Sequence, residues 1–199
     1  MLKKMFENKD SIATLTLSLL IITVCAGLIL GVVYSITKEP IAQQAALKET
    51  VARQTVLPEA DDFTEIDIAG LDVTDEYQII EQVFEGTAGG QTVGYTMAIV
   101  TKGYSPGLSL TVGIGTDGVV TGVEIGSHEE TPGLGANATN PDFLAQYAGA
   151  DGPLVVVKTP TGAEGEVQAL TGATITSNAV TDAVNLARDF YQAYLTGEG

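Results

Sequence analysis

An uncharged run near the N-terminus limits what this chain can fold into more than any other feature. From Ser11 to Thr37 no residue is charged, and most are apolar, as in LTLSLLIITVCAGLILGVVYSI. A helix of about 20 apolar residues crosses the hydrocarbon core of a bilayer. A cleaved signal peptide has a shorter apolar region that ends at a small-x-small site, whereas Ala26 and Gly27 stand in the middle of this run. The run therefore predicts an uncleaved transmembrane helix over residues 11–37.

The lysines on the two sides of this run predict its orientation. Three lysines precede it in the tail of residues 1–10, whereas the two that follow it closely, Lys38 and Lys48, each stand beside a glutamate. Basic residues next to a membrane span stay in the cytoplasm. We therefore expect a single-pass protein of the cell membrane with a cytoplasmic N-terminal tail and an extracytoplasmic C-terminal domain.

The composition excludes several kinds of site. The chain has 25 Asp and Glu against 9 Lys and Arg, a net charge of −16, which disfavours binding to nucleic acid phosphates. It has one cysteine, Cys25 inside the apolar run, and one histidine, His128. A disulfide needs two cysteines, and a zinc or iron–sulfur site needs three or four ligands of these types. We expect no metal site, so redox chemistry would require a bound organic cofactor.

Hydrophobic patterns divide the rest of the chain into elements. Residues 38–58 predict a juxtamembrane helix after Pro40, which ends before Pro58, and residues 59–199 predict one domain. A polar loop over 58–70 joins the two. Within that domain the expected elements are strands over 76–86 and 92–103, a hairpin over 108–127 that turns at Asp117–Gly118, a short helix over 141–148 capped by Asn140, a buried strand over 154–158, and a C-terminal helix from Ser177. Strands and helices do not alternate regularly, so the order predicts an α+β fold with a mainly antiparallel sheet.

A cluster of hydroxyl groups precedes the C-terminal helix. The string Leu170–Ser177 reads LTGATITS, with Thr171, Thr174, Thr176 and Ser177 around Gly172 and Ala173. Free N–H groups at a helix start favour an anion such as phosphate. Threonine and serine are also common N-caps, and both Thr176 and Ser177 suit that position. From composition alone, simple capping and an anion site both remain open.

This string resembles the S/T-G-A-T-x-T/S flavinylation motif of the FMN-binding domain shared by the G-type subunit of the Rnf complex and the C-type subunit of the Na⁺-pumping NADH:quinone reductase. A second segment, HEETPGLG at residues 128–135, resembles the H-x-E-T-P-G-L-G loop of the same family. Gly103-Tyr104 and the following hairpin resemble the region that leads into that loop. The resemblance covers essentially the whole chain. The chain is short and has a short juxtamembrane helix, and in both respects it looks more like the Rnf subunit than like the quinone reductase subunit.

The resemblance implies a membrane-anchored electron-transfer flavoprotein with FMN on Thr174 through a phosphoester bond, attached by a flavin transferase. It implies an Rnf-type complex whose other subunits hold the ferredoxin and NAD sites and couple electron transfer to Na⁺ or proton translocation. The flavin-binding residues it implies are Thr171, Gly172, Ala173, Thr174, Thr176, Ser177, His128, Glu130, Thr131, Pro132, Gly133, Leu134 and Gly135. Family members often have Asp three positions before the first hydroxyl of the core, where this chain has Gln168.

Several interpretations stay open at this stage. His128 is either a hydrogen-bonded loop anchor or a flavin neighbour, and Glu130 is either a solvated carboxylate or part of a flavin-facing loop. Gly133 and Gly135 either only permit turns or let the backbone of residues 131–135 approach the isoalloxazine ring. In the second interpretation Leu134 packs on the face of the ring. Two other functions compete with a role in an Rnf complex: an extracytoplasmic binding or scaffold module without covalent flavin, and a free-standing extracellular electron-transfer flavoprotein.

Overall fold

The computed structural model describes residues 12–68 and 74–196. The N-terminal tail with its three lysines, and Ser11, lie outside the described residues. The helices are α2 (Ile12–Val56), α3 (Pro141–Leu144) and α4 (Thr174–Phe190), with 3₁₀ turns at Asp75–Ile79 and Gly135–Thr139 and a π-turn at Tyr191–Leu195. The strands are β1 (Asp62–Ile66), β2 (Ile80–Ala88), β3 (Gln91–Lys102), β4 (Pro106–Gly115), β5 (Val120–Ile125), β6 (Val155–Val157) and β7 (Glu166–Gln168).

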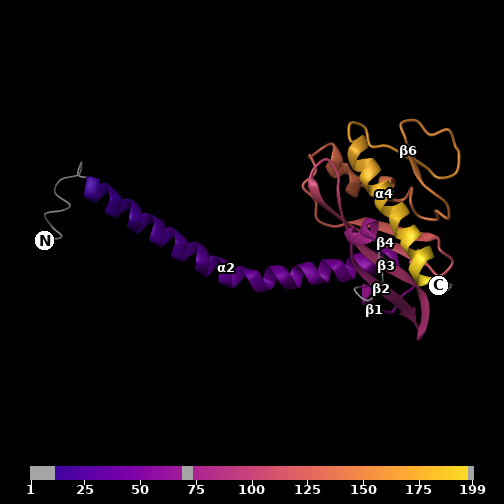
Figure 1. Ribbon diagram of the computed structural model, residues 1–199, viewed down its shortest axis with the longest axis horizontal. Coiled ribbons are helices and arrows are strands. Elements are labelled where there is room, and N and C mark those ends of the chain that lie inside the picture. Colours follow the sequence, from indigo (N-terminus) through magenta and orange to yellow (C-terminus); the bar gives the residue numbers. More distant parts are fainter. Residues whose placement is uncertain (1–11, 69–73, 197–199) are drawn as a thin grey trace. The chain divides into compact units, whose positions relative to one another are not determined.

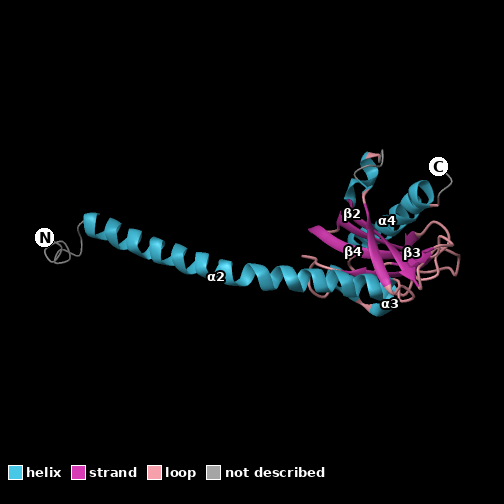
Figure 2. Cartoon of the chain, turned by 90° about the horizontal axis from the view of Figure 1, so that it is seen from below, coloured by secondary structure: helices cyan, strands magenta, loops and turns pink. Residues whose placement is uncertain are grey.

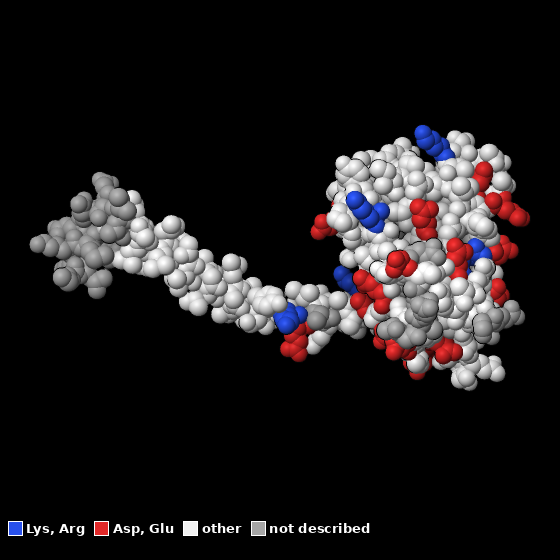
Figure 3. Space-filling model, in the orientation of Figure 1, with Lys and Arg blue, Asp and Glu red and all other residues white. Residues whose placement is uncertain are grey.

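One helix, α2, contains both the expected span and the expected juxtamembrane segment. It is long and apolar enough to cross a membrane, and it is free of charged residues along most of its N-terminal part, which is white in Figure 3. Pro40 lies inside this helix and removes one backbone donor without ending it. The chain from Lys48 onward forms a compact unit of its own, so the last turns of α2 belong to the domain.

The domain is built on a five-stranded antiparallel sheet in the order β1-β2-β3-β4-β5 (Figures 1 and 2). Each strand pairs with its neighbour in sequence, which confirms the α+β fold with a mainly antiparallel sheet. The strongest predicted hairpin, β4–β5, turns where it was expected: Gly118 has φ +80° and the Asp117 carboxylate accepts from the Val119 N–H. The short helix α3 is capped by the Asn140 side chain, as expected.

Three expectations for the domain were wrong. Residues 62–66, expected in a loop, form the edge strand β1, because their backbone pairs with β2. The strand at 155–157 exists but is not buried: it pairs only with β7, in parallel, and Val155 is 58% exposed. Helix α4 begins at Thr174 rather than Ser177, because Ala173 already accepts the first helical bond from the Ser177 N–H.

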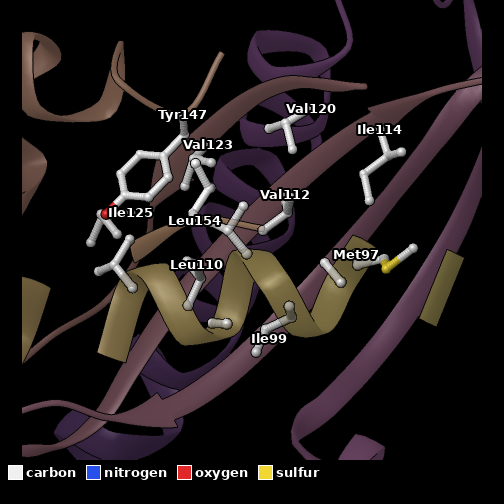
Figure 4. Packing of buried hydrophobic residues seen from close by; sticks show 14 of the residues in the cluster. Met97, Ile99, Leu110, Val112, Ile114, Val120, Val123, Ile125, Tyr147 and Leu154 are labelled. Atoms are coloured by element: carbon white, nitrogen blue, oxygen red, sulfur yellow. The ribbon is translucent and has the colours of Figure 1, made fainter. Parts of the chain in front are cut away.

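Helix α4 covers one face of the sheet and forms the core with it (Figure 4). Val180, Val184, Ala187 and Phe190 are fully buried on the helix, and the facing strands contribute Met97, Ile99, Val112 and Ile114. The buried Tyr147 hydroxyl lies 2.9 Å from the Thr181 hydroxyl and ties the segment after α3 to α4. Past the far end of α4, the Tyr191 hydroxyl donates to the Thr116 carbonyl just after β4, so the start of α4 lies toward the opposite end of the sheet, where β3 and β5 finish.

The opposite face of the sheet receives the end of α2. Gly86, Gly94, Gly113 and Gly122 lie on four successive strands, and a Cβ added to any of them would crowd Val56 or Leu57. The Thr121 hydroxyl donates to the Val56 carbonyl on the same face. Val56 and Leu57 are each 1% exposed, so this row of glycines lets a helix end approach the strand backbones directly.

The glycine row gives a stability prediction. In Gly113→Ala the new methyl overlaps the Val56 carbonyl oxygen and the Thr121 hydroxyl, so we expect a loss of about 1–3 kcal/mol in the free energy of unfolding. Gly152→Ala is the matched control, because open space surrounds that position, and it should stay within about 0.5 kcal/mol. Urea unfolding of the detergent-solubilised chain, followed by circular dichroism, measures both. Equal midpoints for the two variants would show that α2 does not pack closely on the glycines.

Candidate cofactor-binding site

Three segments far apart in the sequence meet at one buried carboxylate. Glu130 is 5% exposed, and its Oε1 accepts a 3.0 Å hydrogen bond from the Ser105 N–H in the turn after β3. Its Oε2 accepts a 2.6 Å hydrogen bond from the Thr176 hydroxyl in the first turn of α4. Glu130 itself lies in the loop after β5. The carboxylate therefore joins the β3–β4 turn, the loop after β5 and the start of α4.

Two glycines allow the three segments to close around this carboxylate. A Cβ at Gly103 would overlap Oε1, and a Cβ at Gly135 would overlap Oε2 and stand 2.7 Å from the Thr176 hydroxyl oxygen. Gly135 is thus needed for close approach rather than for a turn, since only Gly133 has a positive φ (+77°) in this loop. The burial of Glu130 excludes the solvated-carboxylate alternative.

The hydroxyls at the start of α4 have different roles. Thr176 is engaged with Glu130, and Ser177 accepts from the Leu170 N–H at 3.0 Å while donating to the Ala173 carbonyl at 3.0 Å. Both residues lie within α4, and both side chains are buried. The expectation that they are N-caps was therefore wrong. The N-cap position belongs to Ala173, which has no side chain able to cap, and Gly172 precedes it with φ +77°.

Thr174 and Thr171 are the exposed hydroxyls of the motif. Thr174 is the first residue of α4, and for neither hydroxyl does the structure record a hydrogen bond to any described residue. The N–H groups of the first helical turn have no acceptor within the helix, and no side chain caps them here. A solvent-facing hydroxyl beside uncapped N–H donors fits a phosphoryl group.

The loop at residues 131–135 lies beside this helix start. The Thr131 carbonyl accepts from the Leu134 and Ala136 N–H groups at 3.1 and 3.2 Å, which folds the loop into a tight turn. Residues 131–134 are exposed, Pro132 among them. The Leu134 side chain reaches Gly172, where an added Cβ would stand 3.0 Å from its Cδ2. The two family motifs are therefore in contact.

His128 is partly buried, and its Nδ1 makes no hydrogen bond to any described residue. That nitrogen does not anchor the loop. The anchor is one residue earlier: the Ser127 N–H donates to the Ser109 hydroxyl at 2.7 Å, and the Ser109 N–H donates to the Ser127 carbonyl at 2.9 Å.

The surface around Thr174 differs in charge from the rest of the domain. Residues 103–116, 131–141 and 167–181 contain no charged side chain, although acidic residues outnumber basic ones over the face in Figure 3. Three large apolar side chains are exposed on these segments: Tyr104 at 68%, Ile175 at 58% and Leu134 at 43%. Sequence reasoning did not include Tyr104 and Ile175 among the candidate site residues. The absence of charge around both motifs and around Tyr104, in so acidic a chain, was the signal available.

Gln168, the departure from the family motif, lies on β7 with its side chain exposed. Its backbone is held by the Gln146 side chain, which accepts from the Gln168 N–H at 2.7 Å. The nearest carboxylate in sequence, Glu166, is occupied within its own loop. Hydrogen bonds from the Thr161 hydroxyl and from the Thr161 and Gly162 N–H groups hold the pKa of Glu166 below its usual value. Glu166 therefore does not replace the missing Asp.

Comparisons with known proteins identify the family to which these segments belong. Residues 103–189 match the FMN-binding domain family, a range that includes all three segments around Glu130. The G-type subunit of the Na⁺-translocating ferredoxin:NAD⁺ oxidoreductase complex of Acetobacterium woodii is 38% identical, over 89% of this chain and 90% of that protein. The G-type subunit of the proton-translocating ferredoxin:NAD⁺ oxidoreductase complex of Clostridium ljungdahlii is 32% identical, over 96% and 98%.

A solved structure shares the fold. The C-type subunit of the Na⁺-translocating NADH-quinone reductase from Parabacteroides distasonis superposes with a TM-score of 0.54 at 22% identity, covering 70% of this chain and 80% of that one. The antiparallel sheet with its flanking helices is therefore a known architecture.

The bond between Glu130 and Thr176 gives a prediction about stability. Thr176→Val keeps the shape of the side chain but leaves Oε2 of a buried carboxylate without its donor, so we expect a loss of about 1.5–3 kcal/mol in unfolding free energy. Thr171→Val, at an exposed hydroxyl, is the control and should stay within about 0.5 kcal/mol. In a double-mutant cycle with Glu130→Gln the two changes should be non-additive. Additive effects in that cycle would contradict the buried junction.

Proposed function

Because this chain belongs to the family of G-type subunits of Rnf-type ion-translocating oxidoreductase complexes, we propose that it is a membrane-anchored electron-transfer flavoprotein that carries FMN as a phosphoester on Thr174. The observation that supports this attachment site is the division among the motif hydroxyls. Thr176 and Ser177 are buried and hydrogen-bonded, whereas Thr174 is exposed at the first position of α4.

The helix start suits the phosphate of such a linkage. The first-turn N–H groups of α4 carry partial positive charge, and no side chain caps them. Thr171 is exposed nearby and is available to donate to a phosphate oxygen. A threonine hydroxyl is not acidic enough to form the ester alone, so maturation requires a flavin transferase, which needs Thr174 to be accessible as it is here.

Bound FMN would supply the reversible electron transfer of a redox cofactor. The protein's own residues would orient and shield it: Leu134 and Ile175 offer apolar surface beside Thr174, and Glu130 holds their two segments together. The positive φ of Gly133 and Gly172 allows the two turns that bring Leu134 and Thr174 to the same edge.

The ferredoxin and NAD sites of the complex would lie on other subunits. With a single cysteine, located in α2, the chain cannot ligate a cluster of the ferredoxin type. The relatives named above are subunits of ferredoxin:NAD⁺ oxidoreductase complexes that translocate Na⁺ or protons. We assign this chain the same kind of assembly, with electron transfer coupled to one of these ions.

Intact mass spectrometry of the chain co-expressed with a flavin transferase tests the attachment. The wild type should gain the mass of FMN less one water, and Thr174→Ala should not, because the attacking hydroxyl is gone. Thr171→Ala is the matched control, since it removes an exposed hydroxyl of the same motif, and it should still be modified. Gln168→Asp, which restores the family residue on the exposed face of β7, should be modified at least as fast as wild type. Full flavin mass on Thr174→Ala would overturn the assignment.

Topology follows from the helix α2 and the lysines that precede it. We propose that the domain from Lys48 onward lies outside the cytoplasm. Protease added to intact spheroplasts should digest this domain and leave cytoplasmic marker proteins whole. Peptides containing Thr174 that survive in intact spheroplasts, but are cut after detergent lysis, would reverse the orientation.

A further inference from the structure

We propose that the phenol ring of Tyr104 packs against the isoalloxazine ring of the flavin carried on Thr174, an inference that rests on the function proposed above. None of the sequence motifs assigns Tyr104 to the flavin. Its position, exposure and surroundings carry the inference.

The position follows from Glu130. The Ser105 N–H and the Thr176 hydroxyl bind the two oxygens of one carboxylate, at 3.0 and 2.6 Å. Tyr104 precedes Ser105, and Thr174 lies two residues before Thr176. Tyr104 and the flavin attachment point therefore stand at the same edge of the domain, on the two segments that the carboxylate joins. Gly103 keeps this turn closed on the carboxylate, because a Cβ there would overlap Oε1.

Tyr104 differs from the other tyrosines of the domain. Tyr77, Tyr95, Tyr147, Tyr191 and Tyr194 each lie against another aromatic ring, at centroid distances of 4.9–5.7 Å. Tyr104 is 68% exposed, and no ring contact is recorded for it among the described residues. An exposed aromatic ring without a ring partner, beside the attachment point of a planar aromatic cofactor, is placed to supply the offset or edge contact that such rings prefer.

The charge pattern favours a ring over a charged partner as the occupant of this edge. Tyr104, Leu134 and Ile175 each stand on a stretch that lacks charged side chains, and all three present apolar surface in an acidic domain. The isoalloxazine ring is tethered to this surface through Thr174, so contact with it needs no second binding event. A protein partner that docks on Tyr104 instead is an outcome that the experiment separates.

Flavin fluorescence is the direct readout. A phenol close to the ring quenches emission by donating one electron to the excited flavin, and that electron returns on recombination; a phenyl ring does not. The chain has no tryptophan, which is the stronger quencher. Four other domain tyrosines lie near the far end of α4, whose 17 residues extend roughly 25 Å from Thr174: Tyr191 and Tyr194 follow it, and Tyr77 and Tyr95 pack against Phe190 and Tyr191. Tyr147 is nearer, because it bonds Thr181, but it is fully buried and unchanged in every variant compared.

The experiment uses full-length chain that intact mass shows to be fully flavinylated. Tyr104→Phe should raise the fluorescence yield and the mean lifetime severalfold, and Tyr104→Trp should keep both low. Tyr194→Phe is the control and should match wild type. Equal yields for wild type and Tyr104→Phe, with full flavin mass on both, would overturn the contact and leave the attachment on Thr174 intact. Absence of covalent flavin on the wild type would overturn both proposals.

Discussion

The structure around the site depends on one buried carboxylate. Glu130 is shielded from water, and its charge is balanced by the Ser105 N–H, by the Thr176 hydroxyl and by the positive end of α4 beside it. A buried charge without hydrogen-bond donors is costly. The two segments that provide the donors and the loop that carries Glu130 are therefore held together. The turn, the loop and the helix start thereby form one edge, and its outer side presents Thr174, Leu134 and Tyr104.

On our proposal, the same helix end serves two anionic groups in different places, the Glu130 carboxylate and the flavin phosphate. On the buried side, Thr176 and Ser177 face inward and complete the junction with Glu130 and Leu170. On the exposed side, Thr174 and the uncapped N–H groups remain for a phosphate. The motif hydroxyls thus fall into two pairs: Thr176 and Ser177 have buried partners, whereas Thr171 and Thr174 face solvent. On the far face of the sheet, the glycine row seats the end of α2 so that the domain continues directly from the helix that is apolar enough to cross a membrane.

Sequence reasoning predicted the features that depend on local pattern. The charge-free run, the β4–β5 hairpin at Asp117–Gly118 and the Asn140 cap all reflect short-range chemistry, and the structure has each element in place. Features set by distant partners were missed or misread. Edge strand β1 exists because β2 offers it an edge, and its own residues have the polar composition of a loop. The capping roles given to Thr176 and Ser177 were wrong because their partners, Glu130 and Leu170, come into reach only on folding. Two motifs suggested a shared site, but only the fold shows that Glu130 joins them.

The central claim is that, of the two motif hydroxyls that folding leaves exposed, the one at the start of α4, that of Thr174, carries FMN. Trypsin should release residues 159–188 as one peptide, because Lys158 and Arg188 flank the motif with no basic residue between them. Fragmentation of this peptide from the transferase-treated wild-type chain locates the flavin directly. The account predicts FMN on Thr174, with Thr171, Thr176 and Ser177 unmodified. Flavin on Thr176 or Ser177 would contradict it, since their hydroxyls would then have to leave the buried junction that defines the site.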